Sequence, residues 1–88
     1  MSERISKESG VSKPKAAAID WKKVGRRIRE LRGFDINQGE LAGRLGIAQG
    51  HLSRIERGEV EIGAAILLRI GREFGKSIEW LLTGEERG

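Results

Sequence analysis

The chain contains no cysteine, no tyrosine, one proline and four aromatic residues among its 88 residues. Without cysteine it can form neither a disulfide bond nor a zinc site with thiolate ligands. No apolar run reaches the roughly 18 residues that a membrane-spanning helix needs, and the polar, acid-containing start is unlike a secretory signal. We therefore expect a cytoplasmic protein with no membrane partner. A chain this short also excludes a doubly wound nucleotide-binding domain, a barrel and a two-domain enzyme.

Charge is distributed unevenly along the chain, whose net charge is +4. Residues 21–57 carry nine Lys or Arg against four Asp or Glu, which leaves +5. Residues 58–88 carry four against six, which leaves −2. A basic block in a small chain favours a polyanionic partner. A solvated, solubilising surface would carry the same charge, so charge alone leaves the two interpretations equal.

The start of the chain differs in composition from the rest. Its first 15 residues carry Ser, Lys, Glu and Gly, contain the only proline and show no sustained hydrophobic period, which is typical of a flexible arm. Lys13 and Lys15 could reach a DNA backbone, but a solubilising tail is the favoured interpretation. We expect an arm at 1–18, one domain at 19–85 and a short tail at 86–88.

From residue 19 onwards, apolar residues recur at helical spacing in five segments, and no alternating run long enough for a strand occurs. The polar residues Asp20, Asn37 and Ser77 are placed as N-caps, where a side-chain oxygen accepts hydrogen bonds from the free amides of a first turn. Gly25 and Gly71 fall inside predicted helices, so we expect a close helix–helix approach at each. The sequence predicts an all-α domain of five helices. The glycines that end them are Gly33, Gly46, Gly58, Gly75 and Gly84.

The segment 38–57 predicts two short helices joined by a glycine-containing turn, which is a helix-turn-helix. Ala42 is small where the helices would cross, and Gly46 suits the left-handed conformation of the turn. Leu52 and Ile55 would anchor the second helix from beneath. The residues left on the outer surface or its edges are Gln49, Gly50, His51, Ser53, Arg54 and Arg57.

These segments, in this order, resemble the phage repressor and Cro type of helix-turn-helix, often called xenobiotic-response-element-like regulators. The resemblance runs from about Trp21 to Glu85 and rests on VGRRIRELR, NQGELAGRLGIAQGHLSRIERG and SIEWLLTGE. It implies a compact five-helix domain whose third helix enters the major groove of double-stranded DNA, usually as a homodimer on a two-fold-related operator. The implied function is a sequence-specific transcriptional regulator, most simply a repressor that occupies a promoter.

The resemblance also implies roles for single residues. Gln38 would bind a backbone phosphate and brace the third helix, and Gln49 would contact phosphate or a base edge. Arg54 is the best candidate for reading sequence, because a guanidinium can donate two parallel hydrogen bonds to guanine O6 and N7. The other implied DNA-binding positions are Gly50, His51, Ser53 and Arg57.

One structural ion pair is implied as well, and the sequence departs from the pattern at three points. Arg32 and Glu56 match an Arg–Glu pair that ties the first helix to the third. Ala48 stands where relatives carry a capping Ser or Thr, and the connection before residue 38 is one residue short. Glu59 and Glu61 stand where relatives often carry basic residues. We expect these two carboxylates to repel a DNA backbone.

An enzyme or a metalloprotein is disfavoured, and we expect no cofactor. His51 is the only histidine, so it cannot form a zinc site of the usual kind, and no base–nucleophile pair is suitably spaced. A different class stays open, namely an antitoxin-like or bridging subunit that binds a protein partner with the same fold. Trp80 and its apolar neighbours fit either a core or a two-fold interface.

Overall fold

The computed structural model describes residues 18–85, so the predicted tail at 86–88 and all but the last residue of the predicted arm lie outside the described residues. Within 18–85 the chain forms five α-helices and no strand, which confirms the predicted fold class. None of these five helices combines the length and the apolar character needed to cross a membrane. The helices are α3 (Trp21–Arg32), α4 (Gln38–Leu45), α5 (Gln49–Glu56), α6 (Ala64–Phe74) and α7 (Ile78–Thr83).

Local side chains set most of the helix ends. Asp20, Asn37 and Ser77 accept backbone amide hydrogen bonds at the starts of α3, α4 and α7, which confirms the three predicted N-caps. Gly46 ends α4 in the left-handed conformation, with φ 72°. Ala48 precedes α5 with an extended backbone and no side-chain hydrogen bond. Of the two helices of the helix-turn-helix, α4 therefore has a side-chain N-cap and α5 does not.

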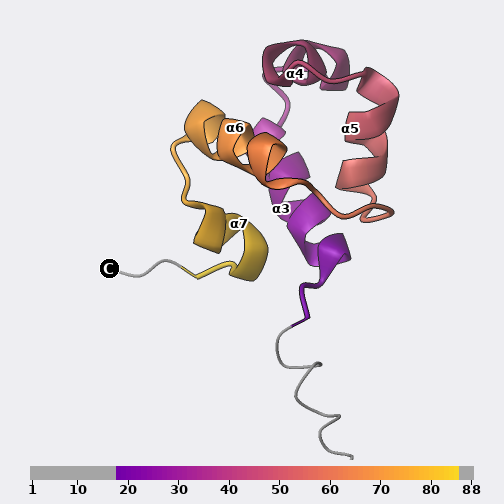
Figure 1. Ribbon diagram of the computed structural model, residues 1–88. Helices are drawn as coiled ribbons and strands as arrows, with labels where there is room; N and C mark the ends of the chain where they lie inside the picture. Colours follow the sequence, from indigo (N-terminus) through magenta and orange to yellow (C-terminus); the bar gives the residue numbers. More distant parts are fainter. Residues whose placement is uncertain (1–17, 86–88) are drawn as a thin grey trace, which may run out of the picture.

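The helices pack around α3, which contacts α5 and α7 (Figure 1). α4 packs against α5 and α6, and α6 packs against α7. In Figure 1, α4 and α5 meet at a corner at one end of the molecule, while α7 lies on the opposite side of α3 from α5. Every helix contributes to the buried core, whose least exposed side chains include Val24, Ile28, Leu41, Leu45, Leu52, Ile70 and Leu81.

A close helix–helix approach occurs at Gly25, as the sequence predicts, whereas at Gly71 the close neighbour is the loop between α6 and α7 instead of another helix. A Cβ added at Gly25 would lie 2.4 Å from the carbonyl oxygen of Ile55 and 2.6 Å from that of Glu56. A Cβ added at Gly71 would lie 2.5 Å from the carbonyl oxygen of Lys76. Real Cβ atoms do not approach so closely, so both positions need glycine. At Gly25 this approach seats the last turn of α5 directly on α3.

Candidate nucleic-acid interface

The outward face of α5 is the first part of the candidate site. α5 buries Leu52 and Ile55, and its other side faces solvent. The side chain of Arg54 is exposed and makes no hydrogen bond or ion pair within residues 18–85. A Cβ at Gly50 would meet no atom within 4 Å, so the backbone there is open to a ligand. His51 is half-buried. The structure thus places these residues on one accessible face without bonding them to one another.

Gln38 connects the two ends of α5. Its Nε2 donates to Glu56 Oε1 at 3.0 Å, in the last turn of α5. Its Oε1 accepts from Gln49 Nε2 at 3.5 Å, in the first turn. The structure therefore brings Gln38, Gln49 and Glu56 together, as the implied bracing role requires. Whether Gln38 or Gln49 also binds phosphate stays a prediction.

The Arg32–Glu56 ion pair joins α3 to the end of α5. Arg32 Nε donates to Glu56 Oε2 at 2.8 Å, and Nη2 donates to Oε1 at 2.9 Å. The side chains are only 16% and 4% exposed, respectively. The hydrogen bond that Arg32 donates to Glu56 raises the pKa of Arg32 above its ordinary value. With Gln38 bonded to the same carboxylate, Glu56 is fully engaged and holds α5 at a fixed angle.

A second ion pair, not predicted from the sequence, lies at the same end of α5. Arg57 Nε donates to Glu59 Oε2 at 2.8 Å and Nη2 donates to Oε1 at 3.2 Å, while Nη1 donates to the Ser53 hydroxyl. Both charged side chains are about half exposed, at 56% and 51%. The bond from Arg57 lowers the pKa of the Glu59 carboxyl. Glu59, expected only to repel DNA, is thus paired, whereas Glu61 makes no ion pair within the described chain.

A basic trough lies beside the contact between α3 and the last turn of α5. One part has a volume of about 310 Å³ and the adjoining part about 200 Å³. Both parts share Arg29, Glu56 and Arg57, so they form one continuous hollow. Its single carboxylate, Glu56, is already bound by Arg32, which leaves a strong positive charge facing solvent. The lining residues of this trough are Lys22, Arg26, Arg29, Arg32, Gln38, Ser53, Glu56 and Arg57.

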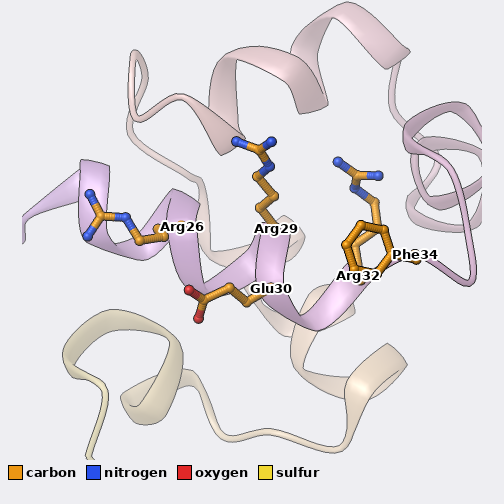
Figure 2. A pocket seen from close by; sticks show the side chains of 6 residues that line it. Arg26, Arg29, Glu30, Arg32 and Phe34 are labelled. Carbon is orange, nitrogen blue, oxygen red and sulfur yellow. The ribbon is translucent and has the colours of Figure 1, made fainter.

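The cations of α3 continue this charge towards the end of that helix. In Figure 2, Arg29 and Arg32 project from α3 to the same side, whereas Glu30 projects to the other. These three residues line a further hollow of about 630 Å³, together with Arg26 and the fully exposed ring of Phe34. These cations belong to the basic block predicted to favour a polyanion, although no individual α3 cation was predicted as a binding residue. Their spacing of four and three residues, at 22, 26 and 29, was the signal that they share a helix face.

Other arginines serve the fold instead. Arg27 Nη1 donates to the carbonyl oxygen of Leu81 at 3.0 Å, near the end of α7. Arg69 Nη1 donates to the carbonyl oxygen of Leu45 at 2.8 Å, at the end of α4. Both satisfy carbonyls that a helix end leaves without an intrahelical partner. Within residues 18–85, no group of three or more His, Asp or Glu is arranged to hold a metal ion.

The comparison with protein families settles the fold family. Residues 26–81 match the helix-turn-helix family. The chain belongs to this family. The match begins in α3 and ends in α7, so it includes the whole of α4 and α5, the two helices of the helix-turn-helix. The resemblance to phage repressor and Cro-type regulators is confirmed. None of the curated proteins matches the chain significantly.

Solved structures share this helix-turn-helix domain. The P22 c2 repressor protein, solved in complex with synthetic operator 9T, is 32% identical with a TM-score of 0.66, and the match covers 70% of this chain and 96% of the repressor. The restriction-modification controller protein C.AhdI from Aeromonas hydrophila is 27% identical with a TM-score of 0.63, covering 70% and 91%. The clp gene regulator ClgR from Corynebacterium glutamicum is 26% identical with a TM-score of 0.63, covering 74% and 86%.

Proposed function

We propose that this helix-turn-helix protein, a DNA-binding transcriptional regulator by its family, is a homodimeric repressor that reads a two-fold-related operator with α5 in the major groove. The observation that carries this proposal is the outward face of α5. Arg54 is exposed there without a bonded partner in the described chain, next to the open backbone at Gly50. The similarity to a repressor solved on its operator supports the same placement.

The proposal assigns two kinds of contact. Arg54 reads a guanine edge through two parallel hydrogen bonds, which discriminates one base pair from another. Contacts to phosphate fix the register of the protein on the duplex without reading sequence. Gln38 and Arg57 make such contacts, with Gly50 allowing the close approach of α5. Gln49, His51 and Ser53 lie on the same helix and contact base edges or neighbouring phosphates. The chemistry needs no cofactor.

The basic trough supplies the electrostatic part of binding. Its α3 cations Lys22, Arg26 and Arg29 make no ion pair within residues 18–85, so their charge is available to a polyanion. Each phosphate that such a cation neutralises releases counterions, so affinity falls as salt rises. This term acts on any DNA sequence. Discrimination must therefore come from α5.

Binding of the full chain to two duplexes tests the proposal. One duplex is selected by the wild-type protein from a randomised pool, and the other has a random sequence of equal length. We expect the selected duplex to bind more tightly at 200 mM salt. Arg54→Ala should weaken binding to it by about 1–3 kcal/mol while changing the random duplex less. Lys23→Ala, an exposed cation outside the trough with no ion pair in the described chain, is the control for a lost positive charge.

The outcome that contradicts the proposal is equal binding of the two duplexes. Loss of all binding as salt rises from about 50 to 200 mM would then leave electrostatics as the only interaction. An Arg54→Ala variant that keeps the full preference for the selected duplex would remove Arg54 from the reading set. The function would then need another residue of α5 to read the operator.

The homodimer, or a protein partner in its place, is favoured by one surface between α6 and α7. Leu68 is 41% exposed and lines a hollow of about 470 Å³ with the half-buried Ile78. Exposed apolar surface of this kind marks interaction sites. We expect the wild type to be a dimer and Leu68→Glu to be a monomer, as measured by light scattering after gel filtration. A dimer that persists in Leu68→Glu places the interface elsewhere.

A further inference from the structure

The turn after α5 fixes the backbone of Glu59 at the edge of the candidate interface. The amide of Gly58 donates to the carbonyl oxygen of Ile55, and the amide of Glu59 donates to that of Arg54, both at 3.0 Å. Gly58 is left-handed, with φ 74°. This is the Schellman arrangement of a helix end. A Cβ at Gly58 would lie 2.5 Å from Lys22 Cα, so the turn also packs tightly on α3.

Because this turn fixes the Glu59 backbone, its carboxylate stays close to two arginines of the interface. It binds Arg57 through both oxygens, at 2.8 and 3.2 Å. The positive charge of Arg54 also contributes to lowering the pKa of the Glu59 carboxyl. Arg57 in turn donates to the Ser53 hydroxyl, one helical turn back on the outward face of α5. The guanidinium thus lies inside the candidate interface, and its counter-ion belongs to the same chain.

We infer that Glu59 is an internal competitor of DNA phosphate for Arg57, and that it lowers the affinity of the interface for every DNA sequence. This inference rests on the proposed function. A phosphate that takes the Nε and Nη2 donors of Arg57 must displace the carboxylate, because these are the two groups bound to Glu59. The pair is half exposed, and such pairs are weak enough to exchange. Glu59 therefore sets the strength of binding without blocking it.

Competition by Glu59 matters for a protein that must find one site among many on DNA. Sequence-independent binding comes mainly from phosphate contacts, and a genome offers a very large excess of such sites. With Arg57 paired to Glu59, that contact contributes little to binding at random sequences. The α3 cations Lys22, Arg26 and Arg29, which make no ion pair in the described chain, keep the general attraction to DNA.

The test compares two single substitutions that remove the same charge. Glu59→Gln frees Arg57, whereas Glu61→Gln removes a carboxylate that makes no ion pair within the described chain. Both are measured in the full chain on the selected and the random duplex, between 50 and 200 mM salt. Glu59→Gln should bind both duplexes more tightly. Because one more phosphate is neutralised, its advantage over the wild type should be about 3.5-fold larger at 50 than at 200 mM salt.

The double variant decides whether Arg57 mediates the effect. We expect Glu59→Gln to have no effect on the salt dependence when Arg57 is already replaced by Gln. Glu61→Gln should leave the salt dependence of the wild type unchanged. The inference is overturned if Glu59→Gln and Glu61→Gln tighten binding equally with parallel salt dependence. It is also overturned if Glu59→Gln keeps its full effect in the Arg57→Gln background, because net charge alone would then explain it.

The proposed function fails on a different observation, namely equal wild-type affinity for the selected and the random duplex. In that case Glu59→Gln still reports whether phosphate competes for Arg57, since the random duplex is sufficient for that measurement. A wild-type chain that binds neither duplex at 50 mM salt would overturn both proposals. Unfolding curves of each variant serve to show that the substitutions leave the fold intact.

Discussion

The two ends of α5 are built in opposite ways. At its start, Ala48 gives no side-chain cap, Gly50 leaves open space, and Gln49 makes a single long hydrogen bond of 3.5 Å. At its end, Glu56 is buried in an ion pair with Arg32, and a tight turn at Gly58 packs on α3. One end offers free backbone amides to an outside group, and the other is anchored to the body of the domain.

The anchored end of α5 contains two ion pairs of nearly equal length that differ in their exposure to solvent. Arg32–Glu56 and Arg57–Glu59 both have a shortest separation of 2.8 Å, yet the first is largely buried and the second half exposed. Water competes for the groups of the second pair but scarcely for those of the first. The two pairs therefore differ in interaction energy although their distances are equal. The buried pair holds the helix in place. The exposed pair is free to exchange partners.

The largest expected effect comes from breaking the buried pair. Glu56→Ala removes the partner of Arg32 and one hydrogen bond of Gln38, leaving a mostly buried charge unpaired. We expect the free energy of unfolding to fall by about 3 kcal/mol, a large part of the stability of a small domain. Urea unfolding followed by circular dichroism measures this loss. The exposed Glu61→Ala should change little, and equal losses in the two variants would contradict the contrast.

Next in size is the crossing of α5 with α3. In Gly25→Ala the new methyl would collide with the carbonyl oxygens of Ile55 and Glu56, so the helices must separate. We expect a loss of about 1–3 kcal/mol in the free energy of unfolding. Gly50→Ala at the open end meets no atom and should raise it by about 0.5–1 kcal/mol. Thermal unfolding should show a lower midpoint for Gly25→Ala and a higher one for Gly50→Ala. A Gly25→Ala variant as stable as the wild type would contradict the comparison.

A smaller gain in stability is expected from adding a side-chain cap at the start of α5. Ala48 already has the extended backbone of an N-cap, with φ −71° and ψ 148°. Ala48→Ser should place a hydroxyl against the free amides of the first turn and raise the free energy of unfolding by about 1 kcal/mol. Ala48→Val adds bulk without an acceptor and is the matched control. No difference between Ser and Val at this position would mean that these amides are already satisfied.

The smallest effect on stability belongs to the exposed pair. Glu59→Gln breaks the ion pair with Arg57 but leaves the backbone hydrogen bond of residue 59 in place. We expect its thermal unfolding to match that of the wild type, because water and salt already screen the pair. A clear drop in the midpoint would show that Glu59 supports the fold, and that any change in DNA binding must be corrected for it.

Most of the fold could be predicted from short-range patterns. Asp20, Asn37 and Ser77 act on amides within three residues, so their capping roles depend only on nearby sequence. The close approach at Gly25 could be predicted as a reason for a glycine inside a helix. Its partner, the last turn of α5, could not, because which surfaces meet depends on the path of the whole chain.

The candidate site shows the same division. The outward residues of α5 could be predicted, since helical periodicity determines which side chains share a face. The Arg57–Glu59 pair could not, although only one residue separates its members. The sequence places Glu59 in an acidic segment, and only the turn at Gly58 brings its carboxylate to Arg57. The role of Arg27 at the end of α7 likewise depends on an approach across 54 residues.

The sequence by itself determined the five helices, most of their ends, the basic middle of the chain and membership of the helix-turn-helix family. The physical reason is that hydrophobic periodicity, capping and charge are properties of neighbouring residues. The tertiary structure alone decided which arginines face solvent and which are occupied. A guanidinium on a flexible chain can bind any acceptor that it reaches, and folding determines which acceptors those are.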